Sequence, residues 1–154
     1  MSRKKIVPTT VPHIEELAET MRQCDVDEVW ASSHTTPLEA LQRGVQFSQE
    51  PFTGLMDGKV VCIFGVSQIS PLSEEARPWL LASDLIDETA HTFLRVNRVY
   101  IREIKKKYPF LQNWVDCRNE KAIRWVKWLG FKFDKPAPYG PDGLDFMRFE
   151  FRRK

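Results

Sequence analysis

Apolar residues recur with two different spacings along this chain, and the changes of spacing divide it into expected strands and helices. In the first half, a largely apolar run from Lys59 to Ile69 follows Asp57-Gly58, a two-residue hairpin signal. We therefore expect this run to pair with a strand at Phe52 to Met56. A helix is expected from Pro37 to about Phe47, because the Thr36 side chain can cap its first turn.

The second half of the chain alternates strands with single helices. The longest helix is expected from about Asp87 to Lys107, where apolar residues recur on one face. A buried strand is expected on each side of it, at Pro78 to Ala82 and at Phe110 to Cys117. A last helix is expected between Asn119, a good N-cap, and Gly130, which takes the left-handed conformation that often ends helices.

Shorter elements complete the pattern. The remaining strands are expected at Lys5–Thr10, Phe131–Phe133 and Leu144–Phe151, and the remaining helices at His13–Gln23 and Asp27–Ala31. Two loops are expected, a polar one at Ser70–Arg77 and a Pro/Gly-rich one at Pro136–Gly143. Strands separated by single helices imply parallel crossovers, whereas the hairpin implies antiparallel pairing. The prediction is one α/β domain over residues 1–154, a mixed sheet of roughly six to seven strands with about four helices.

Composition and the length of the apolar runs argue against four classes of protein. The 154 residues are 42% hydrophobic and 29% charged, which is typical of a folded globular protein and wrong for a disordered one. A net charge of +2 is too small to indicate nucleic-acid binding. Cys24, Cys62 and Cys117 form no Cys-x-x-Cys pair, so we expect reduced thiols and no metal site. With no apolar run near the roughly 20 residues that span a bilayer, we expect no membrane association and a cytoplasmic protein.

The run from Asn119 to Phe131 carries the first family resemblance. Its frame, Asn-x-x-Ala-Ile followed after five residues by Leu-Gly-Phe, resembles the last conserved block of the GNAT acyl-CoA-dependent N-acyltransferases. That resemblance implies a sheet whose fourth and fifth strands splay apart, with acetyl-CoA in the gap if the protein is active. The residues that would then contact the cofactor are Leu81, Ala82, Thr89, Asn113 and Asn119.

Two features depart from that family. A Gly-rich turn at the start of the long helix would hold the cofactor diphosphate, but Ser83 to Thr89 contains no glycine and three acidic residues. We interpret Asp84 or Asp87 as the cap of this helix. The family often places a proton-donating tyrosine seven residues after the asparagine, where this chain has Val126, which cannot transfer a proton.

The candidates that could replace that tyrosine are few. Cys117 ends the expected fifth strand, His91 lies near the start of the long helix, and Tyr139 lies in the Pro/Gly loop. Each also has a structural interpretation, in packing or capping. Asn97 interrupts the apolar stripe of the long helix, so its amide must bond a strand edge, a water molecule or a ligand.

The tryptophans raise two further possibilities. Trp79 and Trp114 lie on the two strands that would flank the gap, so they could fill it outright. Trp128 is expected to point away from the core and to mark a partner surface.

A longer match, from Tyr108 to Phe131, resembles the small internal virion protein family of short-tailed phages. Its residues are Tyr108-Pro109-x-Leu111-x-Asn113-x-Val115-Asp116-x-Arg118-Asn119 and then Ile123-Arg124-Trp125-x-x-Trp128-Leu129-Gly130-Phe131. This resemblance implies a GNAT-like protein of the host cytoplasm or the virion, with a degenerate acetyl-CoA site, that contacts phage structural or host proteins. The alternatives are an active N-acetyltransferase acting on a protein or small-molecule amine, and an effector that inhibits a host protein.

Overall fold

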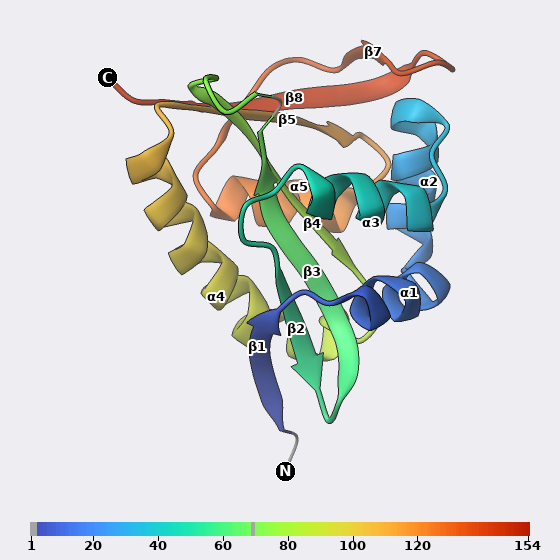
Figure 1. Cartoon of the computed structure of the whole chain (residues 1–154). Coiled ribbons are helices and arrows are strands. Elements are labelled where there is room, and N and C mark those ends of the chain that lie inside the picture. Colours follow the sequence, from blue (N-terminus) through green and yellow to red (C-terminus); the bar gives the residue numbers. More distant parts are fainter. Residues whose placement is uncertain (1–2, 69) are drawn as a thin grey trace.

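The computed structural model describes residues 3–68 and 70–154, and within them eight strands form one open sheet covered by five helices (Figure 1). The strands are β1 Lys4–Pro8, β2 Phe52–Met56, β3 Lys59–Ser67, β4 Glu75–Ala82, β5 Phe110–Asp116, β6 Lys132–Phe133, β7 Ala137–Tyr139 and β8 Leu144–Arg152. The helices are α1 Val11–Thr20, α2 Gln23–Ser33, α3 Pro37–Gln46, α4 Ile86–Lys107 and α5 Glu120–Trp128.

The sheet is mixed and opens in its middle. Its strand order is β1-β2-β3-β4-β5-β8-β6, with β7 also paired to β8. The pairing is antiparallel from β1 to β4 and between β5 and β8, whereas β4 and β5 are parallel. These two parallel strands share only the register pairs Glu75↔Phe110 and Ala76↔Leu111, and then they diverge. The predicted α/β fold and the splayed fourth and fifth strands are therefore confirmed.

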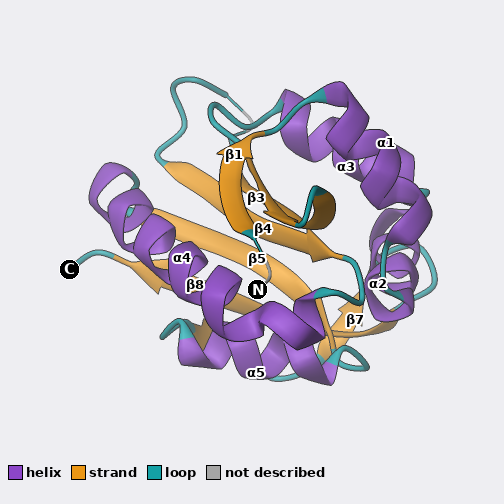
Figure 2. Ribbon diagram, turned by 90° about the horizontal axis from the view of Figure 1, so that it is seen from below, coloured by secondary structure: helices purple, strands orange, loops and turns teal. Residues whose placement is uncertain are grey.

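Helices cover both faces of the sheet. α1, α2 and α3 lie on one face, and α4 and α5 lie on the other (Figure 2). β3 runs between these layers and is buried from Val60 to Val66, as its continuous apolar run predicted. The core is therefore divided by the sheet, and the gap between β4 and β5 connects its two sides. No helix in the described part of the chain is long and apolar enough to cross a membrane.

Several local signals in the sequence are confirmed. The Thr36 hydroxyl accepts from the Glu39 N–H at 3.2 Å, and the Asn119 side chain accepts from the Ala122 N–H at 3.3 Å. Asp57 and Gly58 both have positive φ, as a tight hairpin turn requires. Gly130 follows α5 with a φ of 92°. Each of these signals acts within a few residues of its own position.

Other boundaries differ from the prediction because of contacts between distant parts of the chain. β4 begins at Glu75, inside the expected loop, since Ala76 pairs with Leu111. A short strand, β7, forms within the expected Pro/Gly loop because β8 offers it a free edge. α1 ends at Thr20 rather than at Gln23, because Met21 forms an antiparallel bridge with Ser83.

The start of α4 also corrects the sequence interpretation. Leu85 occupies the N-cap position, and no side chain caps the helix. Asp87 instead accepts a hydrogen bond from Lys121 Nζ at 2.9 Å. The interpretation of Asp84 or Asp87 as the cap was wrong, because tertiary packing placed the helix start between them. The end of the run predicted to reach Ile69 lies outside the described residues.

Candidate functional site

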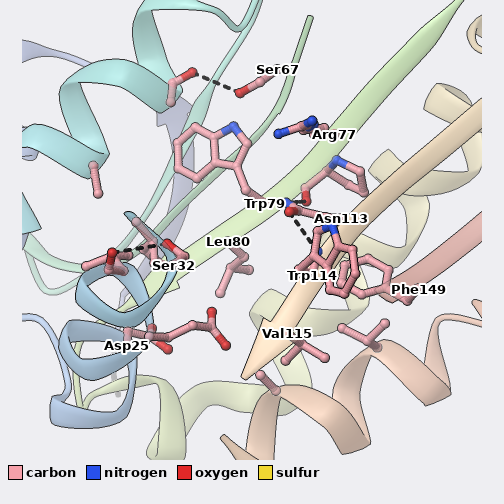
Figure 3. A pocket seen from close by; sticks show the side chains of 18 of the residues that line it. Asp25, Ser32, Ser67, Arg77, Trp79, Leu80, Asn113, Trp114, Val115 and Phe149 are labelled. Carbon is pink, nitrogen blue, oxygen red and sulfur yellow. Dashed lines mark hydrogen bonds between the residues drawn. The ribbon is translucent and has the colours of Figure 1, made fainter. Parts of the chain in front are cut away.

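A cavity of about 530 Å³ occupies the gap between β4 and β5 (Figure 3). The strands supply its walls, and helices from both faces of the sheet supply its ends. The wall residues are Pro78, Trp79, Leu80 and Leu81 of β4 and Asn113, Trp114 and Val115 of β5. The gap therefore offers free volume where the GNAT resemblance implies an acyl carrier.

Two carboxylates of α2 close the wide end of the gap. The Ala82 N–H, at the tip of β4, donates to Asp25 Oδ2 at 3.0 Å. The Asp116 N–H, at the tip of β5, donates to Glu28 Oε1 at 2.8 Å. Asp25 and Glu28 are three residues apart and share one face of the helix. One turn of α2 thus satisfies the backbone donors that the diverging strands leave unpaired.

Asn119 joins these two carboxylates to α5. Its Nδ2 donates to Asp25 Oδ1 at 3.1 Å and to Glu28 Oε1 at 3.4 Å, while its Oδ1 caps the helix. Arg22 Nε lies 3.0 Å from Asp25 Oδ2, in an ion pair rather than a well-aligned hydrogen bond. We call Asp25, Glu28 and Asn119 the carboxylate clasp. Asp25 and Asn119 are almost fully buried, with exposed fractions of 1% and 2%.

Glu28 differs in protonation from an ordinary surface glutamate. Burial raises its pKa first, and the neighbouring charges of Asp25 and Asp116 raise it further, from 4.5 to about 8. The hydrogen bonds from the Asp116 N–H and from Asn119 act in the opposite direction. Glu28 is therefore mostly protonated at neutral pH, and the clasp carries less negative charge than its sequence suggests.

A second bridge crosses the gap nearer its closed end. Asn113 Nδ2 donates to the Pro78 carbonyl at 2.9 Å, and Asn113 Oδ1 accepts from the Trp114 N–H at 2.8 Å. Backbone groups two residues apart in a strand point to the same edge, so Pro78, Leu80 and Ala82 all face the gap. Proline has no N–H. The Ala82 N–H on this edge of β4 is bonded to Asp25. The Leu80 N–H on the same edge therefore has no hydrogen-bond partner among the described residues.

The turn after β4 directs its polar groups into the protein. Ser83 is buried, and its hydroxyl donates to the carbonyls of Val60 and Val61 at 3.1 and 3.3 Å. Thr89, a predicted cofactor contact, donates to the Leu85 carbonyl at 2.9 Å within its own helix. Of the other predicted contacts, Leu81 and Asn113 line the cavity, whereas Ala82 and Asn119 bond to the clasp carboxylates.

The three candidate catalytic residues do not meet at one place. Tyr139 lines the cavity and stacks on Trp114, with ring centroids 4.3 Å apart. His91 lies on α4 and lines a different cavity. Cys117 lines neither, and burial, followed by the charges of Asp145 and Asp116, raises the pKa of its thiol. A raised pKa disfavours the thiolate that a nucleophilic cysteine needs.

The second cavity, of about 500 Å³, lies between α4 and α5, and Arg22 and Leu80, which also line the first cavity, contribute to its lining. Basic side chains are frequent in its lining. The lining residues on the two helices include Ala90, His91, Leu94, Arg95, Lys121, Arg124, Trp125 and Trp128. It opens beside the start of α4, where the resemblance implies the cofactor diphosphate.

Aromatic and amide residues of the gap refine the sequence prediction. Trp79 and Trp114 line the cavity without filling it, and Trp79 Nε1 donates to Ser48 Oγ at 3.1 Å. Asn97 is 2% exposed, and its Oδ1 has no partner in the described residues, so of the predicted partners a strand edge does not serve this atom. Trp128 is 46% exposed, which agrees with the predicted orientation away from the core.

Sequence reasoning missed Asp25 and Glu28 because their partners lie far away in the chain. Ala82 is 57 residues from Asp25, and Asp116 is 88 residues from Glu28. One signal was present: both acids share a helical face with the buried Val29, where a solvated carboxylate is not expected.

Comparison with solved structures supports the fold, whereas comparison of the sequence finds no related protein or family. No family model matches the chain, and no curated protein matches it. Solved structures do match, among them Ard1 from Thermoplasma volcanium, with 18% identity, a TM-score of 0.71 and coverage of 98% of both chains. Aminoglycoside acetyltransferase AAC(6')-Ib in complex with coenzyme A has 15% identity and a TM-score of 0.66, over 98% of this chain and 95% of that one. The GNAT domain of S. lividans PAT has 15% identity and a TM-score of 0.66, over 97% and 90%. This chain therefore has the fold of the GNAT acetyltransferases.

Proposed function

We propose that this protein is a GNAT-fold protein whose acyl-carrier groove is closed at its wide end by its own side chains. In this proposal it acts through contacts with other proteins during assembly of a phage particle. The carboxylate clasp is the observation that carries the proposal, because it occupies the backbone donors at the open end of the gap.

Displacing the clasp would be costly. A carrier that took the Ala82 N–H would leave the Asp25 carboxylate, 1% exposed, with fewer partners in a low-dielectric site. Loss of one partner from a buried charged network typically costs about 3–5 kcal/mol. An incoming amide or thioester oxygen would recover only part of that free energy, since its hydrogen bond replaces one with water.

The segment after β4 offers little to a diphosphate. The Ser83 hydroxyl and N–H bond to backbone carbonyls of β3, so they do not face outward. Asp84 and Glu88 are exposed beside the helix start and repel an anion there. The segment also lacks the glycines that let a backbone approach phosphate oxygens closely.

The chemistry of thioester cleavage also lacks a proton donor at its usual place. Val126 is buried on α5 and cannot protonate a departing thiolate. Cys117 lines neither cavity.

The phage part of the proposal rests on the resemblance from Tyr108 to Phe131. Residues that carry this resemblance also close the gap: Asn113 bonds Pro78 across it, the Asp116 N–H bonds Glu28, and Asn119 completes the clasp. Two side chains of this resemblance, Asn113 and Asn119, therefore also help to close the gap, together with Asp25 and Glu28, which lie outside it.

Calorimetry with acetyl-CoA and with CoA tests the closed groove, with aminoglycoside acetyltransferase AAC(6')-Ib as the binding control. We expect no heat from the full chain at millimolar ligand. Micromolar affinity for either ligand would overturn the proposal. The assembly role predicts co-sedimentation with phage particles or head-core intermediates, and absence from every intermediate would count against it.

An N-acetyltransferase is the second candidate, favoured by one specific observation. Glu28 faces the cavity, and its pKa of about 8 means that its ionised form, a minority at neutral pH, grows at mildly alkaline pH and can serve there as a general base. In that reaction the ionised form of Glu28 accepts a proton from a substrate ammonium, and the free amine attacks the thioester carbonyl. The Leu80 N–H would then bond the oxyanion. Collapse of the tetrahedral intermediate then breaks the C–S bond, and the departing thiolate takes up the second proton lost by the amine nitrogen.

Incorporation of labelled acetyl groups distinguishes the two candidates. Phage or host lysate incubated with the protein and labelled acetyl-CoA should gain no label under the first proposal. Labelling that the Glu28→Gln variant abolishes would establish the enzyme instead.

A further inference from the structure

The groove between α4 and α5 gathers positive charge on a protein whose net charge is only +2. Its floor is apolar, formed by Ala90, Leu94 and the half-buried Trp125. Arg95 and Arg124 lie on its two sides. The groove thus combines an apolar slot with a basic rim.

The positive charge continues along α4 beyond the groove. Arg95, Arg98, Arg102 and Lys105 follow one another at intervals of three or four residues, so they share a helical face. Burial lowers the pKa of Lys105, and the charges of Arg102 and Arg98 lower it further. The cations therefore lie close enough to repel one another.

The exposed acids Asp84 and Glu88 lie at the start of α4, outside the lining of the groove. Asp87 is the carboxylate among the described residues that line the groove, and it is paired with Lys121 Nζ at 2.9 Å. Arg98 is not in an ion pair within the described chain, and its guanidinium lies over the Trp128 ring, 4.6 Å from the centroid. Self-repulsion of this kind is relieved when a negatively charged partner binds.

We propose that this groove binds an acidic segment of a partner polypeptide. An apolar side chain of the segment enters the slot between Leu94 and Trp125, and its flanking carboxylates pair with Arg95, Arg98 and Arg124. Arginine suits this role, because its planar fork accepts a carboxylate in a bidentate geometry. The inference rests on the proposed function, since it names the chemistry of the partner that those protein contacts require.

A nucleic-acid strand fits the groove less well than a polypeptide does. Base stacking needs open aromatic faces, but Arg98 covers one face of Trp128 and Trp125 is half-buried. Binding along a phosphate backbone also favours a domain with a large net positive charge, which this chain lacks. An acidic peptide with an apolar anchor uses both the slot and its rim.

Fluorescence polarisation with labelled synthetic peptides tests the proposal on the full chain. The probe is a peptide of repeated Glu-Glu-Leu, and its neutral counterpart repeats Gln-Gln-Leu. The site variant is Arg98→Gln with Arg124→Gln. The matched control is Lys4→Gln with Lys59→Gln, which removes the same charge from exposed positions at the β1–β3 edge of the sheet.

We expect the acidic peptide to bind, the neutral peptide not to bind, and affinity to fall as salt rises. The site variant should weaken binding by about tenfold or more, and the control by less than about threefold. Equal weakening in both variants, binding of the neutral peptide, or absence of binding to the acidic peptide would overturn the proposal.

Two competitors separate this inference from the proposed function. An oligothymidylate of matched charge that binds more tightly than the peptide would overturn the polypeptide assignment. CoA that binds at micromolar concentration and displaces the peptide would overturn both proposals. Failure of the peptide with no CoA binding would overturn only this inference.

Discussion

The two carboxylate oxygens of Asp25 have different hydrogen-bond partners. Oδ2 accepts from the Ala82 N–H and faces Arg22, whereas Oδ1 accepts from Asn119 Nδ2. These partners come from β4, from the residue before α2 and from the N-cap of α5. A single side chain thus joins three segments of the fold, and its removal takes a partner from buried groups of each, although Asn119 Nδ2 keeps its bond to Glu28 Oε1.

The change Asp25→Ala should therefore destabilise the protein by about 3 kcal/mol or more. Asp27→Ala is the control, because Asp27 is exposed and, within the described residues, accepts from the Gln23 side chain of the same helix alone. It should change the free energy of unfolding by less than about 0.5 kcal/mol. Urea unfolding of both variants measures the difference. Similar losses in the two variants would contradict a role for the clasp in stability.

At the scale of elements, the turn between β7 and β8 presses against the end of α2. Gly140 and Gly143 both have positive φ, of 80° and 65°. A Cβ on Gly140 would lie 2.1 Å from the Ala31 carbonyl oxygen, whereas a Cβ on Gly143 would meet nothing within 4 Å. An alanine at Gly143 therefore introduces backbone strain alone, whereas an alanine at Gly140 introduces the same strain and also a clash with α2.

Gly143→Ala should cost about 1 kcal/mol, the usual penalty of a left-handed alanine. Gly140→Ala should cost at least about 2 kcal/mol more, because the turn must also move away from α2. Thermal and urea unfolding measure both values. Equal costs would show that α2 and the turn separate freely.

Hydrogen exchange tests the closure of the gap along the two strands. We expect slow exchange of the Ala82 and Asp116 amides, because carboxylates of α2 accept their hydrogen bonds. The Leu80 amide should exchange faster, since it faces the gap without a partner. NMR exchange at single-residue resolution provides the measurement. Protection of Leu80 equal to that of Ala82 would mean that the gap is closed along its length.

At the scale of the whole molecule, Glu28 makes stability depend on pH. Its pKa is raised from 4.5 to about 8 in the folded protein, so folding binds a proton between these values. This contribution to the free energy of unfolding is fully present below pH 4.5. It is lost as the pH rises through about 8.

Glu28→Gln keeps an acceptor for the Asp116 N–H and cannot ionise. Its stability relative to the wild type should rise by at least about 1 kcal/mol between pH 5 and pH 9. Unfolding by urea across this range gives the profile. A constant difference would mean that Glu28 titrates as an exposed glutamate does.

The sequence by itself determined the features that depend on near neighbours. The caps Thr36 and Asn119, the Asp57-Gly58 turn and the apolar run of β3 act within a few residues, so their patterns predicted elements correctly. Their order along the chain predicted the mixed sheet, and the GNAT resemblance implied its splayed strands. The start of β4 was missed because its pairing with β5 crosses α4.

Only the tertiary structure decided what lies in the gap. Asp25 and Glu28 satisfy donors that are 57 and 88 residues away, and Asn113 reaches a carbonyl 35 residues away. No periodicity encodes such contacts, because they arise where packed elements bring distant polar groups together under burial. The raised pKa of Glu28 has the same origin, since burial and two neighbouring carboxylates act on it only in the folded chain.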